Sequence, residues 1–348
     1  MTTLHWKSGT AYDFFISLLA LHRAADFGLR PNWAAGVRQR LSSVQREFLE
    51  GIYLFSGVPL DWISNLPEPK DALPVLRGAV ELAPVDRLRL LTLPMDIAPE
   101  AQETLIHIYE KGSATAKEKE LLGRTLTHRN LNFKPSELDR LIKAWIDLDK
   151  SSEQILAALQ EYYEAFFADE ETRIRPVLQA GLEQAQELAG RVSLPALVEE
   201  LSRGVRFADV ESAQELILVP SYWSTPFVFA TSPTKGTLQI VFGCRPDVQS
   251  VSPGAETPDM LMNALKALAD PTRLRILRYL SRQPLTPTEL SRILRLRPPT
   301  VLHHLQALRL AGLVAIRVSE NGEKRYGARS ETLNVIFTSV KDFINKQD

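Results

Sequence analysis

The chain has 348 residues, of which 45% are hydrophobic and 24% charged, and this length suits about two or three domains with buried cores. Its single cysteine, Cys244, excludes an internal disulfide framework and a thiolate metal cluster. The formal net charge of -1 conceals an asymmetry, because residues 258–348 hold 15 Lys and Arg against 8 Asp and Glu, while residues 1–257 hold 26 against 34. An acidic body with a basic end is typical of a chain whose terminal module binds a polyanion.

The start of the chain lacks the features of a secretory signal, namely a basic start, an apolar run and a small-residue cleavage site. No run of about 18 apolar residues is free of charge, so we expect no membrane span and no membrane partner. Together with the cysteine usage, these features predict a cytoplasmic protein.

Residues 1–203 have the pattern of successive helices. Apolar stripes bounded by Pro, acidic first turns and Gly predict helices over 12–28, 42–57, 99–112 and 135–148. The longest helical segment, 151–192, contains Pro176, which should kink it or split it in two.

The pattern then changes to short runs rich in β-branched and aromatic residues. The runs 215–220, 226–232 and 237–243 predict a small antiparallel β-meander at about 214–243. The polar segment 245–259, with three prolines and a glycine, predicts a linker over 245–257. We therefore expect a mainly α protein with a helical regulatory, effector or dimerisation domain over 1–244 and a separate module over 258–348.

The terminal module contains two helix starts in close succession. Asp270 can cap a helix that begins at Pro271, and Thr286 with Glu289 forms a capping box for a second helix. A tight connection leads to a helix over 298–312, which completes a helix-turn-helix. Strand-like runs around Asn321-Gly322 predict a hairpin, and a final helix is expected over 331–344.

These motifs resemble the winged helix-turn-helix of the ArsR family, the arsenic-repressor-like transcription factors. The likeness rests on ALADPTRLRILRYL, TPTELSRIL, PPTVLHHLQALRLAGLV and GEKRYGA, and it extends over about residues 258–346. It implies a homodimeric repressor that binds double-stranded DNA at a pseudo-palindromic operator. Residues 18–41 resemble helical domains that are fused to such modules.

The resemblance places the second helix of the motif in the major groove and the wing on the DNA backbone or in the minor groove. Arginines of 273–297 and the wing cations would neutralise phosphates, whereas base choice would come from the outward face of 298–310, where Gln suits adenine and Arg suits guanine. We expect DNA contacts from Thr286, Thr288, Arg297, Pro299, Thr300, Leu302, His303, Gln306, Arg309, Lys324, Arg325 and Tyr326.

Two positions depart from the family pattern. Arg297 stands at a helix cap where the family has serine, and Leu302 stands on the reading face where the family has a second serine. We interpret both as an altered preference for operator sequence. Loss of DNA binding is the alternative explanation.

In this family the first and last helices of the module form the dimer, and in this chain these would be a short helix expected over 257–270 and the final helix over 331–344. The residues of this chain that would do so are Leu261, Leu265, Leu333, Ile336, Phe337, Val340 and Ile344.

Metal sensing is not expected. The first helix of the motif has no Cys and the last helix no His, so the usual ligands of metal-sensing family members are absent. His303 and His304 are adjacent and project about 100° apart, which does not suit chelation. We interpret His304 as a structural residue or a phosphate contact. No cofactor is predicted.

The body shows no catalytic signature. A glycine-rich phosphate loop, a G-x-S-x-G elbow and H-E-x-x-H are all absent, and His107 and His128 read as ordinary helix residues. We expect the aromatic-rich run 162–167 either to pack in a core or to line an apolar effector pocket. The same two interpretations apply to Trp33, Trp62, Trp145 and Trp223.

The sequence thus predicts a regulator that is not an enzyme and whose body senses a small non-metal effector. Two alternatives stay open: an enzyme that uses the winged helix for targeting, and a scaffold whose winged helix binds proteins.

Overall fold

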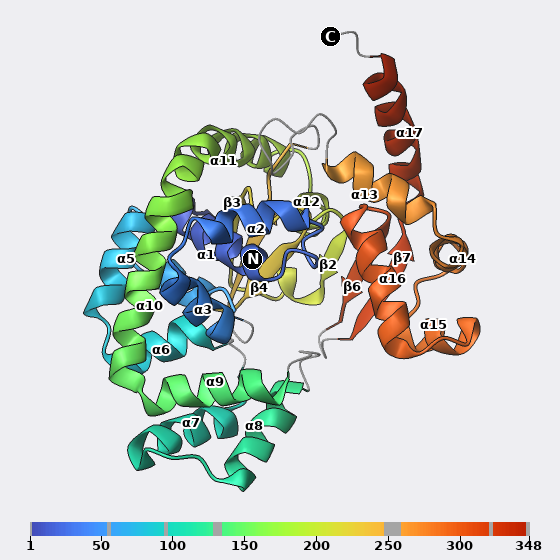
Figure 1. Ribbon diagram of the computed structural model, residues 1–348. Coiled ribbons are helices and arrows are strands. Elements are labelled where there is room, and N and C mark those ends of the chain that lie inside the picture. Colours follow the sequence, from blue (N-terminus) through green and yellow to red (C-terminus); the bar gives the residue numbers. More distant parts are fainter. Residues whose placement is uncertain are drawn as a thin grey trace. The chain divides into compact units, whose positions relative to one another are not determined.

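The computed structural model describes residues 2–53, 57–93, 97–127, 134–246, 259–319 and 323–345. The chain is mainly helical and forms two compact units (Figure 1). We call Gly9–Ala24 with Pro31–Arg175 the helical unit, and Met1–Ser8, Ala25–Arg30 and Pro176–Asp348 the sheet-wing unit. The predicted division into 1–244 and 258–348 differs from this one, because the β-strands of the body belong with the terminal module.

The helical unit begins with helices whose bounds follow the local start and stop signals. These helices are α1 (Thr10–His22), α2 (Pro31–Gln39), α3 (Ser43–Ile52), α4 (Leu60–Asn65), α5 (Ala72–Glu81), α6 (Pro84–Thr92), α7 (Pro99–Lys111), α8 (Ala116–Thr127), α9 (Pro135–Ile146) and α10 (Leu148–Tyr162).

Helix α7 illustrates how the sequence sets these bounds. Pro99 occupies its first turn, where a missing N–H costs nothing, and Gly112 ends it in the left-handed region at φ 71°. The buried side chains of Leu105 and Ile108 then pack with Trp145 in one apolar cluster. The predicted helices at 99–112 and 135–148 are confirmed.

The long predicted helix is interrupted at a different place from the one expected. A π-helical turn, Tyr163–Phe167, follows α10, and α11 (Ala168–Ala189) then continues through Pro176. Of the two expected outcomes at Pro176, a kink or a split, the split is therefore wrong. The boundary between the two compact units nevertheless falls directly before Pro176.

The aromatic run at this turn is part of the helical core. Tyr162 and Phe167 are fully buried, and their rings lie 5.5 and 5.2 Å from that of Phe14. The Tyr162 hydroxyl donates to Ser17 Oγ at 3.0 Å. These contacts are those of core packing.

The sheet-wing unit contains a four-stranded mixed sheet in the order β1-β3-β5-β4. Strands β1 (Thr3–Trp6), β3 (Glu215–Ser221) and β5 (Thr237–Gly243) are parallel, and β4 (Val228–Thr231) is antiparallel to β5. The predicted antiparallel meander is therefore wrong. The strands β3 and β5 are buried along almost their whole length, and such continuous apolar runs are typical of parallel strands.

Helix α12 (Leu194–Leu201) packs on this sheet with the end of α11, through Leu197, Val198 and Ala185. A short strand β2 (Val205–Phe207) and a 3-10 turn (Ala208–Val210) follow it. The predicted linker is described only at its start, where Arg245 is buried and its N–H donates to Thr225 Oγ1 at 3.1 Å. Residues 247–257 of that prediction lie outside the described residues.

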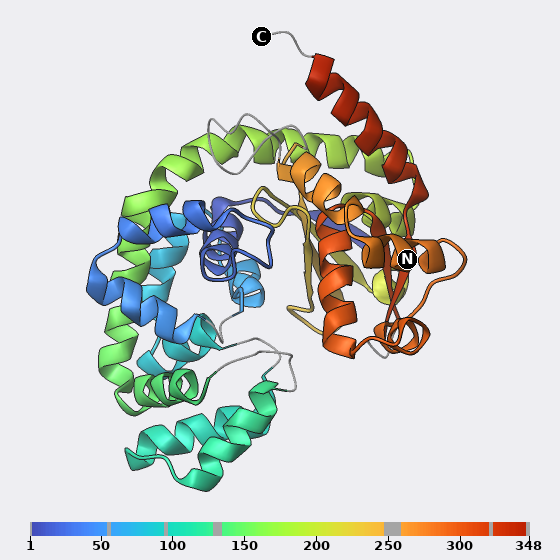
Figure 2. The same ribbon diagram turned by 45° about the vertical axis from the view of Figure 1, so that its right-hand side comes forward.

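The winged-helix module, residues 259–345, follows. Its elements are α13 (Asp259–Leu268), α14 (Pro271–Leu280), α15 (Pro287–Leu294), α16 (Pro298–Leu310), β6 (Val314–Val318), β7 (Lys324–Ala328) and α17 (Ser330–Asn345). Figure 2 shows α16 beside the hairpin of β6 and β7, and in both ribbon views α17 extends away from the rest of the module.

The body supplies a strand to the wing. Strand β2 pairs in parallel with β6, and β6 pairs antiparallel with β7, so the wing sheet has the order β2-β6-β7. The Ile316 N–H also donates to the Gly204 carbonyl at 2.9 Å. The winged-helix module therefore shares a sheet with residues that the sequence assigned to another domain.

Candidate nucleic-acid interface

The helix-turn-helix is built from α15, a three-residue turn and α16. The Thr286 N–H donates to Glu289 Oε2 at 2.7 Å, and the Glu289 N–H donates to Thr286 Oγ1 at 3.2 Å, which confirms the predicted capping box. The hydrogen bond that the Thr286 N–H donates to the Glu289 carboxylate lowers the pKa of that carboxyl group. Arg295 turns the chain in the left-handed region at φ 56°, and α16 starts after it.

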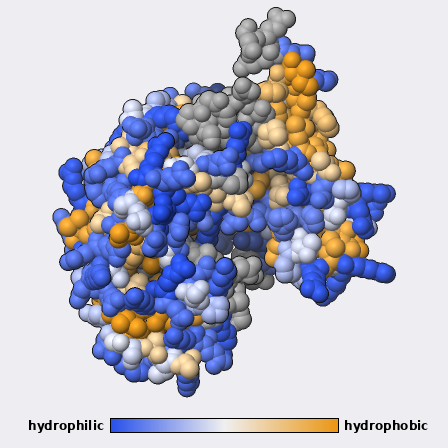
Figure 3. All heavy atoms as spheres, in the orientation of Figure 1, coloured by the Kyte–Doolittle hydropathy of each residue, from blue (hydrophilic) through white to orange (hydrophobic). Residues whose placement is uncertain are grey.

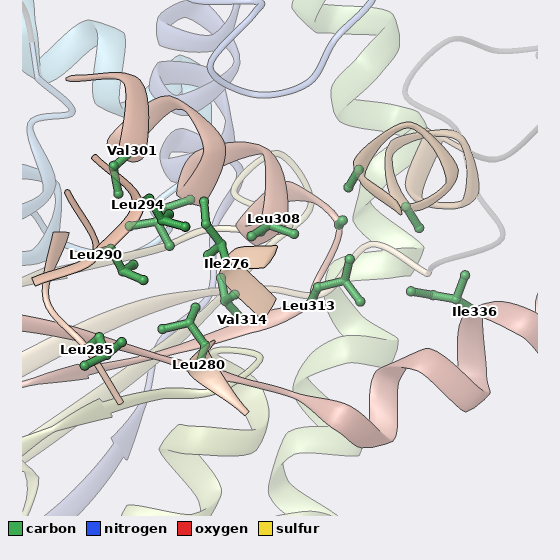
Figure 4. Close-up of a cluster of buried hydrophobic side chains, with 14 residues drawn as sticks. Ile276, Leu280, Leu285, Leu290, Leu294, Val301, Leu308, Leu313, Val314 and Ile336 are labelled. Atoms are coloured by element: carbon green, nitrogen blue, oxygen red, sulfur yellow. The ribbon is translucent and has the colours of Figure 1, made fainter. Parts of the chain in front are cut away.

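A single apolar cluster fixes the angle between the helices. Ile276, Leu290 and Leu308 converge within it (Figure 4), and Val301 and Leu305 pack beside them. Val301, Leu305 and Leu308 are therefore inward, as the helical periodicity predicts. The opposite side of α16 is the candidate reading face.

The N-terminal half of α16 is open to solvent. Arg297, Pro299, Thr300 and His303 are exposed, and Leu302 is half-buried. The Arg297 side chain makes no capping hydrogen bond to α16, as expected where a cation replaces serine. In helix-turn-helix proteins the N-terminal residues of this helix contact base edges.

The C-terminal half of α16 is covered by the body. Gln306 Nε2 donates to the Asp26 carbonyl and carboxylate at 3.4 and 3.3 Å. A Cβ added at Gly28 would lie 3.3 Å from a methyl carbon of Leu310. Residues 25–30 therefore form a loop that lies against this half of the helix.

Arg309 does not lie on the solvent-exposed outward face of α16, where the sequence predicted it. Its side chain is only 7% exposed, and Nη2 lies 3.5 Å from the Ser202 carbonyl. Desolvation by burial lowers the pKa of the guanidinium to about 10, so it stays protonated at neutral pH. In this conformation Arg309 is directed into the protein and does not present its charge to DNA.

Two other residues that were expected to contact DNA make structural contacts within the protein. The hydroxyl of Thr286 is buried in the capping box. Tyr326 packs against the apolar cluster, and its backbone exchanges hydrogen bonds with Leu285 at 2.8 and 2.9 Å. Thr288, by contrast, is exposed on α15.

The wing presents cations. Lys324 and Arg325 are exposed, and Arg325 forms ion pairs with Glu323 at 3.1 Å and Glu289 at 3.6 Å. The predicted Asn321-Gly322 turn lies outside the described residues.

His304 lies on the inner side of α16 near Asp270. Burial lowers its pKa, although the Asp270 carboxylate acts in the opposite direction. Within the described ranges, no group of three or more His, Cys, Asp or Glu side chains is arranged to hold a metal ion.

The predicted dimer residues divide into two sets. Leu261 and Ile336 are buried inside the module, and Leu333 packs against its core. Phe337 is 56% exposed and Ile344 73% exposed, Leu265 on α13 is 40% exposed, and Val340 is half-buried. Figure 3 shows the resulting apolar surface along α17. Sequence periodicity missed Val335 and Phe343, which are exposed on the same helix.

The fold and the exposed helix define a winged helix-turn-helix. Residues 270–315 match the family model described as "Bacterial regulatory protein, arsR family", which confirms the resemblance. The match covers α14, α15, α16 and the start of β6 and supports a DNA-binding transcription regulator. No curated protein and no solved structure matches the chain significantly. None of the described helices is long and apolar enough to cross a membrane.

Proposed function

We propose that the chain is a sequence-specific repressor that binds a pseudo-palindromic operator as a homodimer, and whose body senses a small non-metal effector. The observation that carries the proposal is the exposed N-terminal half of α16, within the segment that matches the arsR family. Repression is the usual mode of this family.

Base choice in this proposal comes mainly from the start of α16. Thr300 and His303 supply hydrogen-bonding groups, and Pro299 and Leu302 supply apolar contacts to thymine methyl groups. Arg297 and Lys324 neutralise phosphates, which adds affinity but no sequence choice. Thr288 and Arg325 reach the backbone on either side.

The exposed apolar face of α17 supports dimerisation. Phe337 and Ile344 expose large apolar side chains that a second copy of the chain would cover. Binding to adjacent half-sites requires that the two copies place their α16 helices about 34–36 Å apart, one turn of DNA.

Effector sensing is supported by the two links between body and module. Residues 25–30 hold the C-terminal half of α16, and β2 extends the wing sheet. A ligand that shifts either link would change the orientation of α16. The two links therefore give a physical route from body to DNA.

The test is selection of duplexes from a random library by the full-length protein, followed by sequencing. We expect an enriched inverted repeat with half-sites about 10 base pairs apart. A Thr300→Ala/His303→Ala variant should lose the enrichment. Weak binding that is indifferent to sequence would contradict the proposal.

A further inference from the structure

A row of three arginines crosses the wing sheet. Arg206 of β2 is in register with Arg317 of β6, and Arg317 is in register with Arg325 of β7. Residues directly opposite one another project from the same face of a sheet, and like charges in such pairs repel. The sequence places these residues far apart, so only the strand register reveals the row.

The two outer arginines of the row are neutralised. Arg206 Nε lies 2.6 Å from Glu199 Oε2, and Arg325 Nε lies 3.1 Å from Glu323 Oε2. The central Arg317 forms no ion pair within the described part of the chain. Its exposed guanidinium therefore carries the uncompensated charge of the row.

A pocket of about 350 Å³ lies on this face of the sheet. Arg206 and Arg317 line it, and Arg282, from the turn after α14, lines it as well. Like Arg317, Arg282 has no ion-pair partner among the described residues. Two unpaired guanidinium groups from separate elements thus face one pocket.

Carboxylates occupy other parts of the same wall. Glu199, Glu200 and Glu331 line the pocket, and Glu331 pairs with Arg329 at 3.3 Å. Such carboxylates would repel a continuous polyanion but accept hydrogen bonds from hydroxyl or amino groups. A pocket wall with both unpaired arginines and carboxylates suits a small molecule that has one anionic group and several hydrogen-bond donors.

A neighbouring pocket of about 420 Å³ provides a contrast. It shares Glu199 and Arg206, but Arg206 is the only arginine among the described residues that line it, and Glu211 adds a second carboxylate. The unpaired cations therefore distinguish the wing pocket from its neighbour.

We propose that the wing pocket binds a small organic anion through its carboxylate or phosphate group, held by Arg282 and Arg317, and that this anion is the effector. A guanidinium donates two parallel hydrogen bonds to either group. The inference rests on the proposed function and moves the effector site from the body alone to the junction of body and module, because Arg282 and Arg317 belong to the winged-helix module and Arg206 to the body. The bound anion would bridge the wing sheet and the α14–α15 turn, and would thereby act on the position of α15 and α16.

The first test is isothermal titration of the full-length protein with inorganic phosphate and, separately, with acetate, against sodium chloride of matched ionic strength. We expect saturable binding of at least one of the two anions at one site per chain. Arg317→Gln and Arg282→Gln should each weaken this binding by about tenfold or more, since each removes a charged hydrogen-bonding group.

The matched control is Arg275→Gln, which removes an exposed arginine of α14 that does not line the pocket. It should leave anion binding unchanged. Thermal unfolding in chloride buffer checks that all variants are folded. Absence of saturable binding by both anions, or an equal loss in Arg275→Gln, would overturn the site.

The second test measures duplex affinity with and without the binding anion at constant ionic strength. We expect a change of about threefold or more in the wild type and none in Arg317→Gln, as for a modest allosteric coupling. Anion binding without any effect on duplex affinity would overturn the effector role. If neither anion binds but Arg317→Gln lowers the slope of duplex affinity against salt, the row is a DNA-backbone contact and the proposal is overturned. The titration uses no DNA, so its failure is distinct from a failure of the proposed function.

Discussion

The two halves of α16 have the same amphipathic pattern but different surroundings. In the N-terminal half, Pro299, Thr300 and His303 face solvent on the outward side. In the C-terminal half, Gln306 is bonded to Asp26, and Arg309 is buried beside Ser202. The outward face of a module can thus be an inward face of the whole chain, and only its first half is free for DNA.

The largest expected effect is a loss of stability, at a buried residue near the middle of α16 that packs the whole helix against the core. Leu305 is 1% exposed at the centre of the module, and Leu305→Ala should lower the free energy of unfolding by about 2–5 kcal/mol. Chemical denaturation measures this loss. Leu302→Ala, on the half-buried side of the same helix, is the control and should cost much less. Equal losses would contradict the assignment of faces.

The next effect distinguishes the two halves in DNA binding. Thr300→Ala/His303→Ala should weaken binding to the selected duplex by about tenfold to a hundredfold, because each base contact contributes about 1–3 kcal/mol. Fluorescence anisotropy checks this, with circular dichroism as the control for folding. An unchanged affinity would show that this half does not read DNA.

Arg309 tests the buried half. Arg309→Met keeps the length of the side chain and removes a buried charge whose only hydrogen bond in the described structure is 3.5 Å long. We expect the free energy of unfolding to rise by about 1 kcal/mol, since apolar replacement of buried charge is often stabilising. Preference for the selected duplex should stay within about threefold. A large loss of that preference would instead make Arg309 a base contact.

Asp26 tests the loop that covers this half. Asp26→Ala removes the carboxylate that accepts from Gln306 and leaves only the bond to the backbone carbonyl. It also removes a negative charge from the vicinity of DNA phosphates, so duplex affinity should rise by about twofold to tenfold. Glu47→Ala, an exposed residue of α3, controls for the change in net charge. A fall in affinity after Asp26→Ala would mean that the loop supports DNA binding.

The smallest effect concerns pH. Burial lowers the pKa of His304 below its ordinary value of 6.5, so the neutral form is favoured in the folded state. Its contribution to stability is present above about pH 6.5 and is lost as the pH falls toward the lowered value. Unfolding measured from pH 7.5 to 5.5 should therefore depend less on pH in His304→Gln than in the wild type. Identical slopes would count against this assignment.

Local signals predicted the local parts of the interface. Asp270 accepts a hydrogen bond from the Arg273 N–H at 2.9 Å, and Thr286 closes its capping box, because caps depend on residues only a few positions apart. The inward placement of Val301 and Leu305 follows equally from helical period.

Features that depend on residues far apart along the chain could not be predicted from such local sequence patterns. Strand β1 and the short β2 have few residues and weak patterns, and their partners lie about 110 or more positions away along the chain. Burial of Arg309 depends on Ser202, and the arginine row depends on the register of three strands. Neither feature leaves a periodic trace in the sequence.

The central claim is that the start of α16, and not its end, chooses the DNA sequence. The most direct measurement is the ratio of affinities for the selected duplex and a scrambled duplex, determined for wild type, Thr300→Ala/His303→Ala and Gln306→Ala. The account predicts that the ratio falls by about tenfold or more in the first variant and by less than about threefold in the second. A ratio that falls in Gln306→Ala and is retained in Thr300→Ala/His303→Ala would contradict it.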